Sequence, residues 1–175
     1  MLKNETTLRM IECAKSDFLK DGYEGVSLKD ICRHAGVTTG AFYHRFHGKD
    51  DLLKAVVEPD AKRFLEMLSV TPSDTVSSLI PESCLAFVYL HLDVFKIVVR
   101  CKCAPYYSEF YNDMDGVVYR RLMKIKSGYT EDICCLLSKA YVTSFFEIIR
   151  CNYDFETAQK CIGVLETFFA SHPHC

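Results

Sequence analysis

Apolar residues recur every three or four positions along most of the chain, which is the spacing that gathers them on one side of a helix. The pattern predicts an all-α fold of about nine helices. Glycines, prolines and capping residues separate the apolar runs and mark where helices begin and end. The expected helices cover residues 6–21, 27–35, 38–46, 48–69, a short stretch after 73, and residues 83–100, 106–126, 130–151 and 154–171.

Residues 83–100 are apolar on more than one side. Leu85, Val88, Leu92, Phe95 and Val99 form one stripe, and other large apolar residues lie opposite them. A helix that is apolar all round is usually buried. The pattern therefore predicts one continuous, central helix over this segment.

Pro59 lies inside the helix expected over residues 48–69. Proline lacks an amide donor and clashes with the preceding turn, so it should kink or divide this helix. Two interpretations remain open: the proline lets the parts on either side of it tilt, or it is a plain helix break.

The segment from Ser27 to Lys49 predicts two short helices joined by a tight turn. Ser27 and Asp30 have the spacing of a capping box, which starts the first helix. Gly36 suits the left-handed position that ends this helix. Thr38 is placed to cap the second helix.

The second of these helices has two different faces. At about 100° per residue, Ala41, Phe42 and Phe46 fall on one side. The opposite side carries small and polar residues, namely Thr39, Gly40, Tyr43 and His44. Small side chains let a helix backbone approach base edges, and a tyrosine hydroxyl reaches phosphate oxygens. A helical hairpin whose aromatic residues simply fill a core is the alternative interpretation.

The charge of this segment supports DNA binding, whereas the net charge of the whole chain does not. The whole chain has a net charge of −2, and residues 1–58 hold equal numbers of acidic and basic side chains. Between Ile31 and Lys49, however, there is no acidic residue, whereas Arg33, Arg45, Lys49 and three histidines are present. This local excess is typical of a surface that binds a polyanion.

Residues 8–57 resemble the DNA-binding domain of the TetR family of transcriptional repressors (TetR/AcrR-like). The resemblance is carried by Asp30-Ile31, Ala35-Gly36-Val37, Gly40, Phe42-Tyr43, Phe46 and Lys49. It implies a helix-turn-helix DNA-binding domain over residues 1–47 and a helical-bundle domain for ligand sensing and dimerisation over residues 48–175. Gly48 stands where members of the family often have a stronger helix cap, such as serine or asparagine. Thr39 stands where some members have a long polar side chain, so the operator sequence is not predicted.

The resemblance also implies a function and a set of DNA contacts. The expected protein is a homodimeric repressor that binds double-stranded DNA at a near-palindromic operator and is released by a small, largely apolar molecule. The residues implied to contact DNA are Ser27, Lys29, Thr38, Thr39, Gly40, Ala41, Tyr43, His44 and Lys49. An interaction protein made of helices, without DNA binding, is the alternative if the polar face is buried.

A ligand pocket is expected where aromatic residues with polar tips gather in the larger domain. Taken singly, each of these side chains is better explained as core; as a set, the resemblance favours a cavity. The candidates are Phe87, Tyr89, His91, Phe95, Tyr106, Tyr107, Phe110, Met114 and Tyr141.

The last two helices have more apolar surface than one face of a bundle needs, which indicates a subunit interface. The resemblance implies a four-helix contact between two copies. The candidate interface residues are Leu137, Phe145, Ile148, Ile149, Ile162, Leu165, Phe168 and Phe169.

Ten cysteines are present without Cys-x-x-Cys pairs, and the first residues are too polar for a secretory signal, so we expect reduced thiols and a cytoplasmic protein. The most apolar window is too short to cross a bilayer. No catalytic motif is recognisable, and we expect no enzyme activity, cofactor or metal. The alternative regulator would sense thiols or metals through Cys101 and Cys103.

Overall fold

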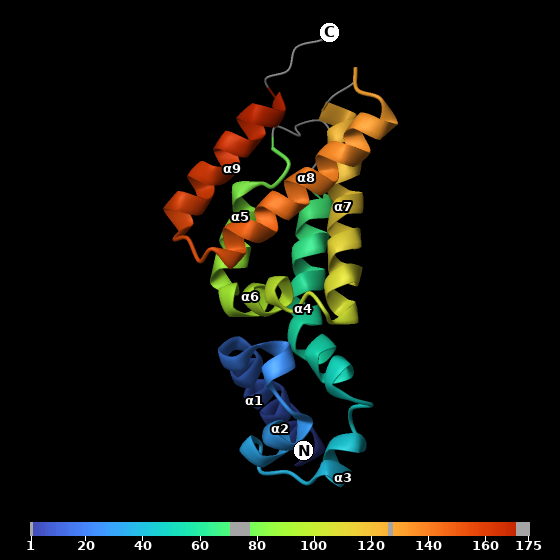
Figure 1. Ribbon diagram of the computed structural model, residues 1–175, viewed down its shortest axis with the longest axis vertical. Coiled ribbons are helices and arrows are strands. Elements are labelled where there is room, and N and C mark those ends of the chain that lie inside the picture. Colours follow the sequence, from blue (N-terminus) through green and yellow to red (C-terminus); the bar gives the residue numbers. More distant parts are fainter. Residues whose placement is uncertain (1, 71–77, 126–127, 171–175) are drawn as a thin grey trace. The chain divides into compact units, whose positions relative to one another are not determined.

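The structure is a computed structural model that describes residues 2–70, 78–125 and 128–170, with side chains from residue 5 to residue 168 within these ranges. The described residues form nine helices and no strand, which confirms the all-α prediction (Figure 1). The helices are α1 (Leu2–Gly25), α2 (Leu28–His34), α3 (Thr39–Tyr43), α4 (Lys49–Val70), α5 (Glu82–Leu90), α6 (Leu92–Arg100), α7 (Pro105–Ile125), α8 (Glu131–Arg150) and α9 (Phe155–Ala170). None of the helices in the described ranges is long and apolar enough to cross a membrane.

The chain divides into two compact units. The first combines Met1–Ala61 with Asp93–Ser108, and the second combines Lys62–Leu92 with Glu109–Cys175. The two units are defined by which residues pack together. The division expected after residue 47 instead separates DNA binding from ligand sensing and dimerisation. That division remains a prediction.

Buried side chains of α1, α2, α3 and α4 form a core in the first unit. In α1, the helical backbone is kinked at Gly22, whose φ of 74° is the left-handed conformation that glycine adopts without strain, and the kink lies where the sequence predicted the end of the helix. The helices α1 and α2 pack together, as do α2 and α3. Fully buried side chains join them: Met10, Ala14, Phe18, Ile31, Phe42 and Leu52.

The second unit is a helical bundle with an aromatic core. The Phe64 ring stacks on Phe145, with centroids 6.0 Å apart, and lies 6.2 Å from Phe110. Phe110 stacks in turn on Phe146 at 5.7 Å. These rings join α4, α7 and α8, and all four are at most 2% exposed.

The single helix expected over residues 83–100 is wrong. The segment breaks at His91, whose φ of −114° and ψ of 31° are not helical, and α5 and α6 lie on either side of the break. Leu90 is 79% exposed, so this segment is not buried all round. Apolar residues on several faces are equally compatible with two short helices that bury different sides.

Two further expectations concern Pro59 and the short helix after residue 73. The helix α4 runs through Pro59 without being divided. Pro81 precedes α5, where a proline costs no helical hydrogen bond. The short helix expected after residue 73 begins in residues 71–77, outside the described part of the chain.

Candidate nucleic-acid interface

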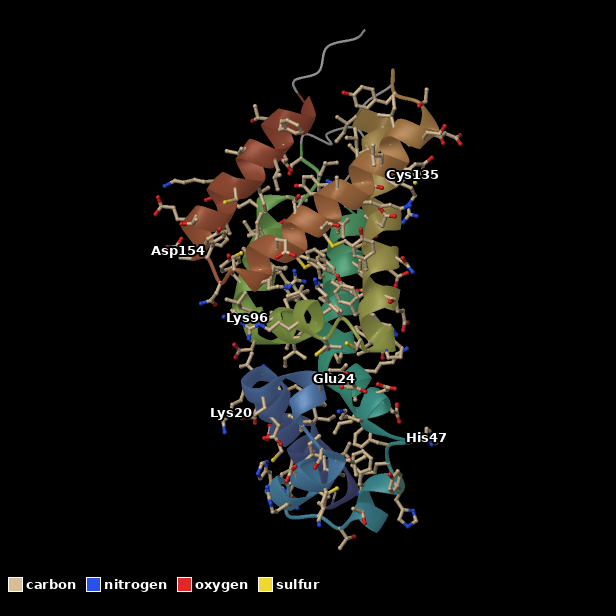
Figure 2. All side chains as sticks on the ribbon, in the orientation of Figure 1. Lys20, Glu24, His47, Lys96, Cys135 and Asp154 are labelled. Atoms are coloured by element: carbon tan, nitrogen blue, oxygen red, sulfur yellow. The ribbon has the colours of Figure 1, made fainter. Side chains whose placement is uncertain are left out.

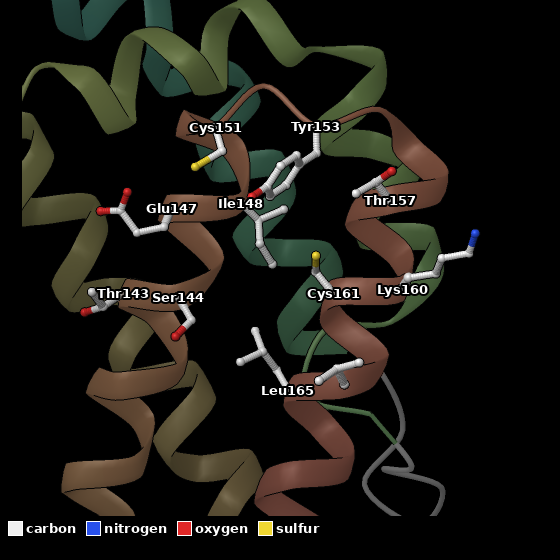
Figure 3. A pocket seen from close by; sticks show the side chains of 11 residues that line it. Thr143, Ser144, Glu147, Ile148, Cys151, Tyr153, Thr157, Lys160, Cys161 and Leu165 are labelled. Atoms are coloured by element: carbon white, nitrogen blue, oxygen red, sulfur yellow. The ribbon is translucent and has the colours of Figure 1, made fainter.

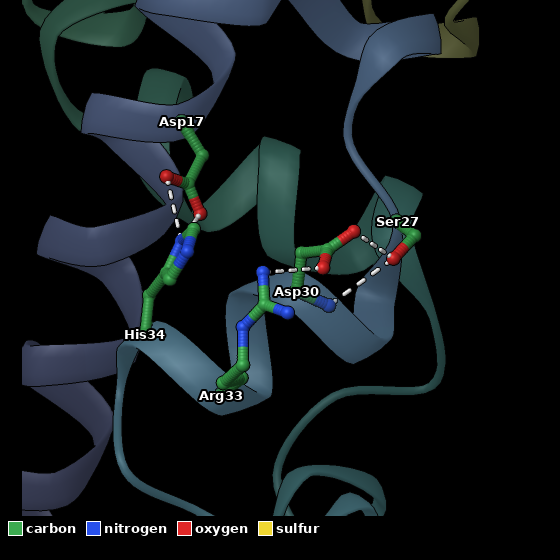
Figure 4. Close-up of polar contacts among 5 residues, drawn as sticks. All are labelled: Asp17, Ser27, Asp30, Arg33 and His34. Atoms are coloured by element: carbon green, nitrogen blue, oxygen red, sulfur yellow. Dashed lines mark hydrogen bonds and ion pairs between the residues drawn. The ribbon is translucent and has the colours of Figure 1, made fainter.

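The start of α2 is built by Ser27 and Asp30. The Ser27 hydroxyl oxygen accepts a hydrogen bond from the Asp30 amide at 3.1 Å and donates to the Asp30 carboxylate at 2.5 Å (Figure 4). This donation holds the pKa of the Asp30 carboxyl below its usual value. The same carboxylate lies 2.7 Å from Arg33. The expected cap is therefore present: the Ser27 hydroxyl oxygen caps the Asp30 amide, and the Asp30 carboxylate accepts a hydrogen bond from the same hydroxyl.

The end of α2 is fixed by a turn at Gly36, which has a φ of 62°. The Gly36 amide donates to the Arg33 carbonyl and the Val37 amide to the Cys32 carbonyl, the pair of bonds that defines a Schellman motif. His34 Nδ1 lies 2.9 Å from Asp17 of α1, so the same end of α2 is also tied to α1 (Figure 4).

The short helix α3 begins at a threonine cap and presents one open face. The Thr38 hydroxyl oxygen accepts from the Ala41 amide at 3.1 Å. Phe42 is fully buried and Phe46 is 6% exposed, whereas Tyr43 is 60% exposed. The remaining residues expected on the open face, Thr39, Gly40 and His44, are exposed as well. The two faces expected from the sequence are thus present.

Two of the cations in this region are held inside the first unit. Lys49 Nζ donates to the carbonyls of Tyr23 at 2.7 Å and Val26 at 3.0 Å, and it lies 4.1 Å from the centre of the Tyr23 ring. Arg45 Nε donates to the Thr7 hydroxyl at 2.6 Å. Sequence reasoning assigned these cations to the binding surface. It missed their partners because Tyr23 and Thr7 are distant in sequence.

Tyr23 contacts Asp50 as well as Lys49. Its hydroxyl donates to the Asp50 carboxylate, and burial together with this hydrogen bond raises the pKa of the tyrosine. The contact joins the end of α1 to the first turn of α4. No motif in the sequence indicates this pairing.

The nine residues predicted to contact DNA lie on three stretches of the first unit, namely the start of α2, residues 38–44 and the start of α4. Ser27 and Lys29 are exposed at the start of α2, and Thr38 at the start of α3. Ala41 and Lys49 are half-buried, and the Lys49 ammonium points to backbone carbonyls. DNA contact by any of these residues stays a prediction.

The residues predicted to line a ligand pocket fall into both compact units. Phe95, Tyr106 and Tyr107 belong to the first unit, and the others to the second. Within the second unit, Phe110, Met114 and Tyr141 are almost fully buried, whereas Phe87, Tyr89 and His91 are half-buried. The Phe87 and His91 rings stack at 4.4 Å. The set is therefore divided between the two units, and a ligand pocket lined by it stays a prediction.

A polar cluster that the sequence analysis missed surrounds Tyr141. Its hydroxyl donates to Glu166 at 3.2 Å, and burial raises its pKa strongly. Glu166 also accepts from the Ser78 hydroxyl at 2.5 Å and from the Leu79 amide at 2.8 Å. These contacts join α8, α9 and the residues before α5.

A groove of about 550 Å³ lies between α8 and α9 (Figure 3). Its lining is mainly apolar and includes Ile148, Val164 and Leu165, with Glu147 and Lys160 also in the lining. Of the predicted interface residues, Phe145, Ile148, Ile149 and Ile162 are buried within the single chain. Phe168 is 63% exposed, Leu137 and Leu165 are half-buried, and the Phe169 side chain lies outside the described residues.

The two cysteines of the thiol alternative have different environments. Cys101 is 4% exposed, and burial raises the pKa of its thiol to about 11, whereas Cys103 is exposed. A protonated, buried thiol is a poor nucleophile and a poor metal ligand. No group of three metal-binding side chains occurs within residues 2–70, 78–125 and 128–170.

The capped turn and the open face of α3 define a helix-turn-helix protein. A family model described as bacterial regulatory proteins, tetR family, matches residues 11–56. Residues 11–56 of the chain are therefore of the TetR type. Two curated relatives and one protein of the same fold are described as transcriptional regulators.

Individual relatives extend this result. The chain is 32% identical over 60 residues to the HTH-type transcriptional regulator UidR of Escherichia coli strain K12, a match that covers 34% of this chain and 31% of UidR. The chain thus spans about a third of the length of UidR. It is 29% identical over 166 residues to the HTH-type transcriptional regulator SrpR of Pseudomonas putida, covering 93% of this chain and 70% of SrpR.

Solved structures share the fold over nearly the whole chain. NalD of Pseudomonas aeruginosa, the secondary repressor of the MexAB-OprM multidrug efflux pump, superposes with a TM-score of 0.68 at 19% identity and 95% coverage of both chains. A transcriptional regulator from Aquifex aeolicus VF5 has a TM-score of 0.63 at 22% identity, covering 94% of this chain and 99% of the other. The second unit, which the family model does not match, therefore has a known fold.

Proposed function

We propose that this protein is a DNA-binding transcriptional regulator that acts in the cytoplasm as a homodimeric repressor of a near-palindromic operator. The observation that carries the proposal is the open face of α3. Tyr43 and His44 are exposed beside Thr39 and Gly40, while the apolar face is buried on the core. A helix presented in this way enters a major groove.

The small residues of α3 give the open face its proposed role. Gly40 and Thr39 lie in its first turn and add little bulk, so the backbone of α3 comes close to base edges. The Tyr43 hydroxyl and the exposed Lys29 ammonium then reach phosphate oxygens. Base contacts would thus come from the first turn of α3, and phosphate contacts from Tyr43 of α3 and Lys29 of α2.

We propose a dimer because α3 is too short to recognise a long DNA site alone. The helix α3 spans only five residues, which contact a few base pairs. Two copies related by a twofold axis read two half-sites and so bind selectively. The exposed apolar residues Leu136, Val164 and Phe168 on α8 and α9 supply the surface that we assign to the second copy.

We assign ligand sensing to the second unit. Phe110, Met114 and Tyr141 form an apolar interior with a buried tyrosine hydroxyl, a mixture that suits a small, largely apolar molecule. One protein of the same fold is described as a gamma-butyrolactone receptor. Such a ligand releases DNA only if it binds the non-binding arrangement more tightly.

Selection of bound duplexes from a random-sequence pool tests DNA binding directly. We expect enrichment of near-palindromic sites, with affinity that falls as salt rises. Lys29→Ala should lower the salt slope of log K by about one, because one phosphate contact is lost. Lys139→Ala, which removes an exposed lysine from α8, should leave the slope unchanged. Failure to retain duplex DNA at low salt would contradict the proposal.

A further inference from the structure

The permanent cations of the proposed DNA-binding surface are largely engaged within the protein. Lys49 and Arg45 donate to groups of the first unit, and Arg33 is paired with Asp30. Of the four lysines and arginines between Ser27 and Lys49, Lys29 alone has no such contact within the described residues. This leaves few permanent charges for phosphate.

Two histidines lie at the same surface with their side chains open. His44 caps the end of α3 and is exposed, and His47 is exposed in the connection to α4. Figure 2 shows the His47 side chain directed away from the ribbon. Neither imidazole makes a hydrogen bond or ion pair with another described residue, although the His47 amide donates to Asp51. An imidazole in water takes up its proton near neutral pH.

We propose that protons regulate DNA binding at this surface: His44 and His47 bind DNA phosphates in their protonated form, so affinity rises as pH falls through neutrality. The inference rests on the DNA-binding function proposed above. A nearby phosphate favours the charged imidazole and raises its pKa in the complex above the pKa in the free protein. Each imidazole therefore takes up a proton as DNA binds.

The acidic groups of α2 and of the first turn of α4 each have a partner within the protein. In α4, Asp50 accepts from Tyr23 and Asp51 from the His47 amide. In α2, Asp30 binds Ser27 and Arg33. Internal carboxylates therefore do not compete strongly with DNA for the two imidazoles.

The other charged groups on the surrounding helices are few. On α1, Asp17 is paired with His34, and Glu5 and Arg9 are exposed near Thr7, which Arg45 contacts. Arg45 and Lys49 themselves flank the two histidines in sequence.

The sign of the effect follows from linkage. A group whose pKa rises on binding adds affinity that is fully present below its free pKa and is lost as pH rises through its pKa in the complex. One unit of pKa shift corresponds to about tenfold in affinity for each histidine. Binding by the wild type should therefore weaken between pH 6 and pH 8 by about tenfold or more.

The test measures affinity from pH 6 to pH 8 at constant ionic strength, with a labelled duplex recovered from the random-sequence pool and a 30-base-pair duplex of mixed sequence as the nonspecific probe. The variant with both His44→Gln and His47→Gln should show little dependence on pH. The variant with both His44→Arg and His47→Arg should bind at pH 8 as tightly as the wild type at pH 6. His34→Gln is the matched control, because His34 is paired with Asp17, and it should keep the wild-type slope.

The outcomes separate this inference from the function on which it rests. Tight binding with no dependence on pH, or an unchanged slope in the double glutamine variant, overturns the histidine proposal and leaves DNA binding intact. No binding to either duplex at any pH overturns DNA binding itself. Circular dichroism of each variant at both pH values distinguishes a lost contact from a lost fold.

Discussion

The Ser27 hydroxyl has two partners at the start of α2, since it accepts from the Asp30 amide and donates to the Asp30 carboxylate. The amide is one of the donors that every helix start leaves without an intrahelical acceptor. The carboxylate lies near the positive end of the helix, which favours its charged form. One small side chain thus positions α2, the helix that precedes α3.

Replacement of Ser27 by alanine should lower the free energy of unfolding by about 1 kcal/mol, the usual cost of losing a helix cap. Ser16→Ala, at an exposed position inside α1, should have almost no effect. Urea unfolding of both variants at pH 7 gives the comparison. Equal stability of Ser27→Ala and wild type would show that the cap contributes nothing.

The same substitution should have a pH-dependent component. Ser27 lowers the pKa of Asp30 in the folded protein, so this contribution is present above the ordinary carboxyl pKa and is lost as pH falls through the lowered one. The difference between wild type and Ser27→Ala should therefore be smaller at pH 3 than at pH 7. A difference that widens in acid has the wrong sign for this explanation.

Local rules explain why much of this surface could be predicted from the sequence. Ser27, Gly36 and Thr38 act on residues only a few positions away, and the alternation of faces in α3 follows from helical geometry. The contact of Lys49 with Tyr23 spans 26 residues and follows no local rule. The sequence therefore indicates which face of α3 is open but not which cations remain available to DNA.

At the scale of elements, one buried arginine joins three parts of the second unit. Arg121 of α7 is 6% exposed and donates to the Leu68 carbonyl of α4 at 2.8 Å and to the Ser78 carbonyl at 2.7 Å. Charged donors make stronger hydrogen bonds than neutral ones. Arg121 thus fixes the end of α4 and the residues before α5 against α7.

Arg121→Met should lower the free energy of unfolding by about 2–4 kcal/mol, because the side chain keeps its bulk but leaves two carbonyls without their charged donor. Arg120→Met removes the neighbouring, exposed arginine and should cost less than about 0.5 kcal/mol. Chemical unfolding at one protein concentration measures both. Similar losses for the two variants would rule out a special role for Arg121.

The break at His91 shows where periodicity stops being informative. A segment with apolar residues on several sides fits one buried helix or two helices with different buried faces. The sequence gives no strong breaker there, because neither glycine nor proline occurs between Ser83 and Arg100. Tertiary packing decides between the two, with Val94, Phe95 and Ile97 buried from α6.

At the scale of the whole molecule, the proposed dimer depends on apolar residues that the single chain leaves exposed. The sequence does not separate these from the residues that the second unit needs for its own core. Phe145 and Ile149 were expected at the interface and are buried within one copy, whereas Val164 is 70% exposed. Both kinds of residue follow the same helical spacing, so periodicity alone does not distinguish them.

Val164→Glu should therefore dissociate the proposed dimer. Val164 lines the groove between α8 and α9, and a carboxylate placed there would lose its water when a second copy covers it. We expect dimer affinity to fall at least about a hundredfold, a cost of roughly 3 kcal/mol for an unpaired buried charge. Sedimentation velocity over a range of protein concentrations measures the change.

Val70→Glu is the matched control, because Val70 is 79% exposed on α4 and lies outside the α8–α9 surface. It should leave the dimer intact. If dimerisation pairs two reading helices, Val164→Glu should also lose selective binding to a palindromic duplex while keeping weak, salt-dependent binding to a single half-site. A Val164→Glu protein that sediments as the wild type does would show that the interface lies elsewhere. A wild type that remains monomeric at every concentration would rule out the dimer, and a single α3 helix would then have to read the operator.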